Sequence, residues 1–535
     1  MYTKTWVSSF ALGLLSLAAQ AQNALTYTTN NGAITITGHT DPALSVTNVI
    51  IPAGINGYPV VSIGIDAFHN CTHLTNVFIP NSITNIDIGA FDNVPTLANV
   101  AIPAGVLALA DKAFNTCTAL TNILFLGNAP ALGASVFNGD SAIIYTGTTN
   151  GWGATYGGLV VSPLQIGLAG GAIAITGFSS STNAVTIPAV IGGYPITSVG
   201  AQAFSDSALT SITIPSSITS IADAAFTNCT SLRNFIIPDT VTNIGSHAFY
   251  NCTSLTNIVL PNSLTSINDF VLYGCTALTS VTIPSSATSI GDAAFQNDFG
   301  LTNITIANSV TNIGSSAFQN DAGLTSIIIP DSVTSIGSLA FLAASSLTNI
   351  VIPNSVTSIR DYVFYGCTLL ASVTVPNSIT TIGNAAFANC KSLTSVTIPN
   401  SVTSIGSDPF FSCPALTNIT FLGNAPTLGG DLLDGDPATI YYYYGTSGWG
   451  TTYSGVPTVM LGAPAPQIQN GTGLQSGSFG FTVTGVSNQS VIIEASTDLV
   501  NWQPVWSNTL SSSFATFTDP QWKNYPARFY RAQSQ

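Results

Sequence analysis

A proline recurs every 23 residues through the middle of the chain. Leucine stands six residues before each of these prolines, isoleucine six residues after it, and phenylalanine or leucine eleven residues after it. One unit of this length cannot bury its own apolar face, so the period indicates a repeat architecture in which neighbouring units stack. Ala307 occupies one slot of the series, whose prolines are Pro215, Pro238, Pro261, Pro284, Pro330, Pro353, Pro376 and Pro399.

The repeating unit reads N-C-x-S-L-T-S-I-x-I-P-N-S-V-T-S-I-G-x-x-A-F-x, as in "NCTSLTNIVLPNSLTSI" at residues 251–267. Its "LTSITIP" block has apolar residues two apart, which is the strand period, and the proline closes that strand. The "SVTSIG" block predicts a second short strand. The "xxAFxNC" block is too short for an isolated helix, so we expect a single helical or 3₁₀ turn that places its phenylalanine in the core. The period therefore predicts a β-rich solenoid with parallel sheets.

These blocks resemble the leucine-rich repeats of the BspA type, which occur in bacterial secreted and surface proteins. The "SLTSI-x-IP", "SVTSIG" and "AF-x-NC" blocks carry the resemblance, and they extend over most of the chain. The resemblance implies a leucine-rich repeat solenoid. It also implies a role in adhesion or protein interaction, because relatives of this kind are mostly described in those terms.

The repeat runs twice along the chain. "GAITITG" at 32–38 reappears as "GAIAITG" at 171–177, and "LTNILFLGNAPALG" at 120–133 reappears as "LTNITFLGNAPTLG" at 416–429. Atypical end units act as caps for a solenoid. We therefore expect a short capped array over 24–163 and a long one over 164–462, the alternative being one continuous solenoid with an internal irregularity.

The N-terminus has the features of a secretory signal peptide over residues 1–21. Lys4 supplies a positive charge, the apolar stretch from Phe10 to Ala19 has the right length, and Ala19-Gln20-Ala21 forms a small-x-small cleavage site. The apolar stretch is shorter than the ~20 residues that span a membrane. We expect a secreted or surface location without membrane insertion after signal cleavage.

The C-terminal residues follow a different pattern. Residues 463–473, "APAPQIQNGTG", predict a linker. Short alternating runs then follow, and they predict a small β-sandwich over 474–535. Its "EASTDLVNWQPV" block resembles the fibronectin-type or immunoglobulin-like modules attached to large bacterial secreted proteins.

Charge is scarce in this chain. Eight lysines and arginines face 22 acidic residues, which gives a formal net charge of −14. Nucleic-acid binding needs clustered cations along the phosphate backbone. The composition therefore argues against a nucleic-acid partner.

All eight cysteines occupy one column of the repeat, and the same column also accepts Val94, Asp298, Asp321 and Ala344. A nucleophile or a metal ligand would not be exchanged for valine or alanine from unit to unit. We expect buried free thiols, with pairing of some adjacent units or metal binding as the alternatives. The cysteines are Cys71, Cys117, Cys229, Cys252, Cys275, Cys367, Cys390 and Cys413.

The other candidate metal-binding and catalytic motifs in the sequence are weak. "HNCTH" (69–73) has metal-ligand residue types, but its cysteine belongs to the core column, and "GGDLLDGDP" (429–437) lacks the spacing of a calcium loop. The chain has four histidines and one glutamate, Glu494, and it contains no nucleophile elbow, P-loop or dinucleotide fingerprint. We expect no enzyme activity, no catalytic residue, no cofactor and no metal.

The alternation along the "LTSITIP" strand predicts an extended outward face of amides, hydroxyls and β-branched methyl groups. Repeat proteins bind partners through such faces. The near absence of charge favours an uncharged partner, either a protein or a neutral glycan, and the alternative is a passive structural or surface-layer spacer. The candidate binding residues, called the strand face below, are Asn234, Ile236, Asn257, Val259, Asn303, Thr305, Ser326, Ile328, Asn349 and Val351.

Overall fold

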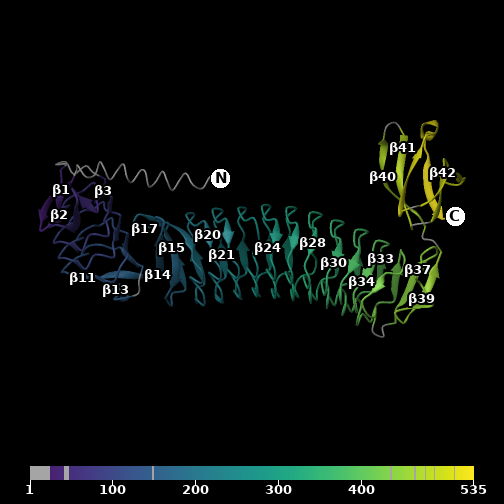
Figure 1. The fold of residues 1–535 in the computed structure, drawn as a ribbon, viewed down its shortest axis with the longest axis horizontal. Helices are drawn as coiled ribbons and strands as arrows, with labels where there is room; N and C mark the ends of the chain where they lie inside the picture. Colours follow the sequence, from purple (N-terminus) through teal and green to yellow (C-terminus); the bar gives the residue numbers. More distant parts are fainter. Residues whose placement is uncertain are drawn as a thin grey trace. The chain divides into compact units, whose positions relative to one another are not determined.

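The computed structural model describes residues 25–40, 47–147, 150–433, 437–462, 465–475, 478–486, 489–510 and 512–534. The expected signal peptide, 1–21, lies outside them. The chain divides into two compact units, residues 1–232 with 236–248 and residues 233–235 with 249–535. In each unit successive repeats lie side by side as turns of a solenoid (Figure 1), and one such turn is called a rung below.

The first strand of most rungs is three or four residues long and ends before the proline position, and in one rung it is reduced to a bridge between Ser326 and Asn349. In β26 the outer residues Asn303 and Thr305 are exposed, and Ile304 between them is buried. The first strands are β3 (Asn48–Ile50), β6 (Asn76–Phe78), β8 (Asn99–Ile102), β10 (Asn122–Phe125), β16 (Ala184–Thr186), β19 (Ser211–Thr213), β21 (Asn234–Ile236), β23 (Asn257–Val259), β24 (Ser280–Thr282), β26 (Asn303–Thr305), β29 (Asn349–Val351), β31 (Ser372–Thr374), β33 (Ser395–Ile398) and β35 (Asn418–Phe421).

The second strand is two residues long and corresponds to the "SVTSIG" block. Both strands pair in parallel with their counterparts in the next rung, for example Ser280 with Asn303 and Asn312 with Ser335, so the 23-residue period sets the register. The second strands are β7 (Asn85–Ile86), β9 (Ala108–Leu109), β11 (Ala131–Leu132), β20 (Ser220–Ile221), β22 (Asn243–Ile244), β25 (Ser289–Ile290), β27 (Asn312–Ile313), β28 (Ser335–Ile336), β30 (Ser358–Ile359), β32 (Thr381–Ile382), β34 (Ser404–Ile405) and β36 (Thr427–Leu428).

The expected helical or 3₁₀ turn of the "xxAFxNC" block is wrong. Ala224 and Asn228 flank Phe226 with positive φ angles of 54° and 58°, and residues in the left-handed region interrupt a right-handed helix. The Phe226 N–H bonds instead to the Ala248 carbonyl of the next rung at 2.8 Å. The block is therefore a series of reverse turns, and the one helix among the described residues is the 3₁₀ helix η1 (Trp522–Asn524). Among the residues that the structure describes, no helix is long and apolar enough to cross a membrane.

Stacked phenylalanines fill the core beneath these turns. In the second unit six of them follow one another with ring centroids between 5.4 and 5.7 Å apart and nearly parallel ring planes. Each pair contributes about 0.5–1.5 kcal/mol beyond area burial. This column explains why the repeat keeps an aromatic residue at one position, and its members are Phe295, Phe318, Phe341, Phe364, Phe387 and Phe410.

The caps and the junction between the arrays use longer strands and hairpins. They are β1 (Leu25–Asn30), β2 (Ala33–His39), β4 (Gly54–Ile55), β5 (Tyr58–Ile63), β12 (Ile143–Thr146), β13 (Thr155–Tyr156), β14 (Leu159–Ala169), β15 (Ala172–Phe178), β17 (Val190–Ile191), β18 (Tyr194–Val199), β37 (Thr439–Tyr443), β38 (Thr452–Tyr453) and β39 (Val456–Leu461).

The boundary drawn between residues 163 and 164 falls inside β14. This strand pairs in parallel with β12 of the short array and antiparallel with β15 of the long array. One sheet therefore runs from β3 to β22 across the junction. The end of the first array and the start of the second share a hairpin, so they are not separate caps.

The C-terminal module consists of two three-stranded antiparallel sheets, β40-β41-β44 and β43-β42-β45. Residues 467–473, placed in the linker by their composition, belong instead to the first strand of the module, which pairs with β41. Phe481, Val483, Val491, Ile493, Leu510 and Phe517 make up the core. The resemblance to fibronectin-type or immunoglobulin-like modules stays a prediction. The module contains β40 (Gln467–Gln475), β41 (Ser478–Thr484), β42 (Ser490–Ser496), β43 (Gln503–Thr509), β44 (Phe514–Asp519), η1 and β45 (Phe529–Ser534).

Candidate binding face

All ten residues of the strand face are exposed in the structure. The apolar ones protrude strongly, because the exposed fraction is 76% for Ile236, 56% for Val259, 84% for Ile328 and 61% for Val351. The residue between the two outward positions of each strand is buried, as the alternation predicts. The strand period therefore identified the outward positions correctly.

Stacking brings several of these residues together. Ser326 pairs with Asn349 across neighbouring rungs, which places Ile328 beside Val351, and Asn349 pairs with Ser372 in the next rung. Among the described residues, the side chains of Ser326 and Asn349 make no hydrogen bond within the protein. Their polar groups are available to a partner.

Neighbouring hydroxyl groups serve the solenoid itself. Thr302 Oγ1 donates to the Thr279 carbonyl of the preceding rung at 3.1 Å, and Thr348 Oγ1 donates to the Thr325 carbonyl at 3.3 Å. In the second strand column, Thr334 Oγ1 donates to the Thr311 carbonyl at 3.2 Å. Much of the threonine content is therefore explained by bonds between rungs.

The eight cysteines are free thiols and all are buried. Six of the sulfur atoms donate to a backbone carbonyl of the preceding rung. For example, Cys367 Sγ donates to the Phe341 carbonyl at 3.2 Å, and Cys390 Sγ donates to the Phe364 carbonyl at 3.3 Å. Burial raises the pKa of Cys367 to about 12. A thiol with this pKa has little thiolate at neutral pH and is a poor nucleophile.

Two aspartates replace cysteine in the same column. Asp298 Oδ1 accepts a 2.6 Å hydrogen bond from the backbone N–H of Cys275 in the preceding rung. Burial raises the pKa of both Asp298 and Asp321, and the charge of Asp321 raises the pKa of Asp298 further. Asp298 Oδ2 and Asp321 Oδ2 are buried without a partner.

The metal candidates do not form a ligand cluster. Among the described residues no three His, Cys, Asp or Glu side chains could hold a metal ion together. In "HNCTH" His69 Nδ1 lies 3.7 Å from Asp92 Oδ2, and Cys71 is buried in its column. Asp434 and Asp436 of "GGDLLDGDP" lie outside the described residues.

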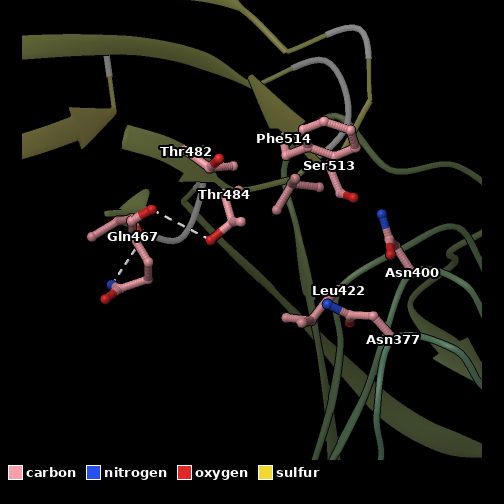
Figure 2. A pocket seen from close by; sticks show the side chains of 11 residues that line it. Asn377, Asn400, Leu422, Gln467, Thr482, Thr484, Ser513 and Phe514 are labelled. Carbon is pink, nitrogen blue, oxygen red and sulfur yellow. Dashed lines mark hydrogen bonds between the residues drawn. The ribbon is translucent and has the colours of Figure 1, made fainter. Parts of the chain in front are cut away.

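One pocket of the second unit, about 510 Å³ in volume, is shown in Figure 2. Gln467, Thr484 and Phe514 of the C-terminal module line it together with Asn377 and Asn400. Thr484 Oγ1 donates to the Gln467 carbonyl at 3.3 Å, so these two lining residues are engaged in joining β41 to β40 (Figure 2).

A second pocket, about 450 Å³ in volume, was missed by sequence reasoning. It lies on the reverse turns of the last rungs and is called the turn pocket below. Its residues occupy variable columns of the repeat, where no pattern marks them. They are Tyr365, Ala385, Ala388, Asp408, Phe411 and Asp431.

Comparison with known families agrees with this architecture. A family model described as the BspA type leucine rich repeat region matches residues 43–149, 197–325 and 311–436, with six copies in all. These ranges include more than half of the chain. No match was found among curated proteins.

The chain is also similar in sequence to several proteins of known structure. A leucine-rich repeat protein from Bacteroides ovatus is 23% identical, and the match covers 82% of this chain and 98% of that one with a TM-score of 0.38. A leucine rich cell surface protein from Faecalibacterium prausnitzii is 25% identical over 75% of this chain and 94% of that one, with a TM-score of 0.28. The pneumococcal vaccine antigen PcpA is 16% identical, and the match covers 79% of this chain and 93% of that one, also with a TM-score of 0.28.

Proposed function

Since the chain belongs to the BspA-type leucine-rich repeat family, we propose that it is a secreted or surface-displayed protein that binds another protein through the strand face. The role is adhesion or interaction, without catalysis. The features of a signal peptide at residues 1–21 support export. The family, whose members are typically surface or secreted proteins, supports the same location.

One observation carries the proposal. Ile328 and Val351 expose most of their side chains on adjacent rungs, and no internal packing accounts for them. Full burial of such a side chain against a partner is worth about 1.5–3 kcal/mol. A contact centred on these two residues and surrounded by Ser326 and Asn349 has the apolar centre and polar rim of a protein interface.

The chemistry of the face favours a protein over a neutral glycan. Sugar rings stack on aromatic side chains, and the strand face has none. β-Branched side chains with amides and hydroxyls at their edges suit the apolar surface and backbone groups of a protein.

The test is a binding screen of the full chain against surface proteins of host and neighbouring cells and against neutral glycans. We expect saturable binding to one protein, lost in the Ile328→Asp and Val351→Asp variants. Leu369→Asp is the matched control, since Leu369 is an exposed leucine outside the strand face. Equal binding by all variants would contradict the proposal.

A second candidate function is a passive structural spacer. The threonine hydroxyl groups that donate to backbone carbonyls of the preceding rung favour this function, because such bonds hold neighbouring rungs together and make the solenoid rigid. For a spacer, no partner in the screen would show saturable binding.

A further inference from the structure

The turn pocket arises from a gap in one column of the repeat. Tyr365, Ala388 and Phe411 each follow a core phenylalanine by one residue, in three successive rungs. Alanine in the middle rung leaves a hollow with an aromatic side chain on either side, about 10 Å apart at two rung spacings. Ala388 and Ala385 are buried and form its floor.

Two carboxylates line the same hollow. Asp408 and Asp431 occupy equivalent places in successive rungs, and both are exposed. Other aspartates on the turns are engaged by the backbone, as Asp361 Oδ1 is by the Asn384 N–H at 2.7 Å. Within the described part of the chain, neither the Asp408 nor the Asp431 carboxylate accepts a hydrogen bond. Both are free to meet a ligand.

The pocket therefore combines two aromatic side chains, two unengaged negative charges and a small apolar floor. Aromatic faces attract cations, and carboxylates pair with ammonium and guanidinium groups. None of the described residues that line it is lysine, arginine or histidine. A neutral sugar could stack on the rings, but it would leave both charges without a counter-ion.

We propose that the turn pocket binds a positively charged side chain, arginine or lysine, of a partner protein. The inference rests on the proposed function for the nature of the partner. The pocket uses residues after the core phenylalanine and on the turns, whereas the strand face uses residues before the proline. The two sites can therefore be tested separately.

The test uses the full chain and L-argininamide as the probe, with saturation-transfer difference NMR as a readout suited to weak ligands. We expect a signal from the arginine side-chain protons that falls steeply in about 0.5 M salt, because ion pairs of exposed groups are screened. Ala388→Gln should reduce it about fivefold or more by filling the hollow. Glutamine is accepted at Gln296 and Gln319 of the same column, so this variant should fold.

A second variant keeps the test decisive. Asp408→Asn with Asp431→Asn removes both charges at nearly unchanged shape, and asparagine tolerates the positive φ of Asp408. We expect loss of the argininamide signal in this double variant, and an unchanged signal in the matched control Gln319→Ala.

Three outcomes would overturn the proposal. One is no signal from argininamide with the wild-type chain, and another is a signal of equal size in the wild-type, Ala388→Gln and double Asn chains. The third is binding of methyl glucoside that survives the double Asn substitution, which would assign the pocket to a neutral sugar. Ile328→Asp should keep the argininamide signal, so a failure of the strand-face proposal is distinguishable from a failure here.

Discussion

The backbone N–H of Asp298 donates a 2.9 Å hydrogen bond to Asp321 Oδ1, and both side chains are fully buried. One oxygen of each carboxyl is engaged with the backbone, and the other is buried without a partner. Burial of two adjacent carboxyl groups favours their protonated forms. The cysteine column therefore contains two acids that prefer to be neutral.

This pair predicts that acid stabilises the second unit. The pKa of each carboxyl is higher in the folded than in the unfolded chain, so its contribution is fully present below the unfolded pKa and is lost as pH rises through the folded pKa. Above about pH 4, the free energy of unfolding should fall by about 1.4 kcal/mol per pH unit for each carboxyl that stays protonated in the fold. Urea unfolding between pH 4 and pH 7 measures this slope.

Asp298→Asn with Asp321→Asn should flatten that pH dependence, because asparagine still accepts the backbone bond and does not titrate. Asp331→Asn, at an exposed aspartate, is the control and should leave the slope unchanged. A slope that is the same in the wild-type and double Asn chains would show that the two carboxyls ionise alike in the folded and unfolded states.

The cysteines predict a second outcome. Every thiol is buried, and the pKa of Cys117 is raised to about 12, chiefly by burial. A thiol reagent should therefore react slowly with the native chain and should count close to eight groups once the chain is unfolded. A count of six or fewer in the unfolded, unreduced protein would show that adjacent rungs are cross-linked.

The phenylalanine column predicts a graded loss of stability. Phe341 stacks between Phe318 at 5.4 Å and Phe364 at 5.6 Å and is fully buried. Phe341→Ala should cost about 3–5 kcal/mol of unfolding free energy by leaving a cavity. Phe341→Leu should cost clearly less, since Leu272 occupies the same column in its own rung. Urea unfolding of both variants checks the order, and equal losses would argue against cavity formation as the main cause.

The sequence predicts those features that repeat in every rung. The 23-residue period, the buried column of Leu, Ile and Phe, and the outward positions such as Ile328 follow from spacing alone. The turn pocket cannot be predicted from spacing, because Ala388 forms the floor of a hollow only once Tyr365 and Phe411 of the neighbouring rungs lie on either side of it. The helical turn was mispredicted because left-handed φ angles at Ala224 and its equivalents are not marked by glycine.

The junction between the arrays could not be predicted either, since no repeat pattern shows that β14 pairs with both β12 and β15 and so continues one sheet from the short array into the long one. Its packing depends on Gly192, which has a φ of 58° and lies against the short array. A Cβ at this position would stand 2.6 Å from Leu124 Cβ. Gly193 beside it has a φ of 85°, and nothing lies within 4 Å of the Cβ it would carry.

Alanine substitutions at these two glycines distinguish the cost of backbone strain from the cost of lost packing at the junction. Gly193→Ala should cost about 1–3 kcal/mol, because a left-handed backbone disfavours any side chain. Gly192→Ala has the same backbone strain and in addition forces β17 away from Leu124, so its loss of unfolding free energy should be distinctly larger. Urea unfolding of the two variants, followed by circular dichroism, measures the difference. Equal losses would mean that the two arrays do not pack through this contact in solution.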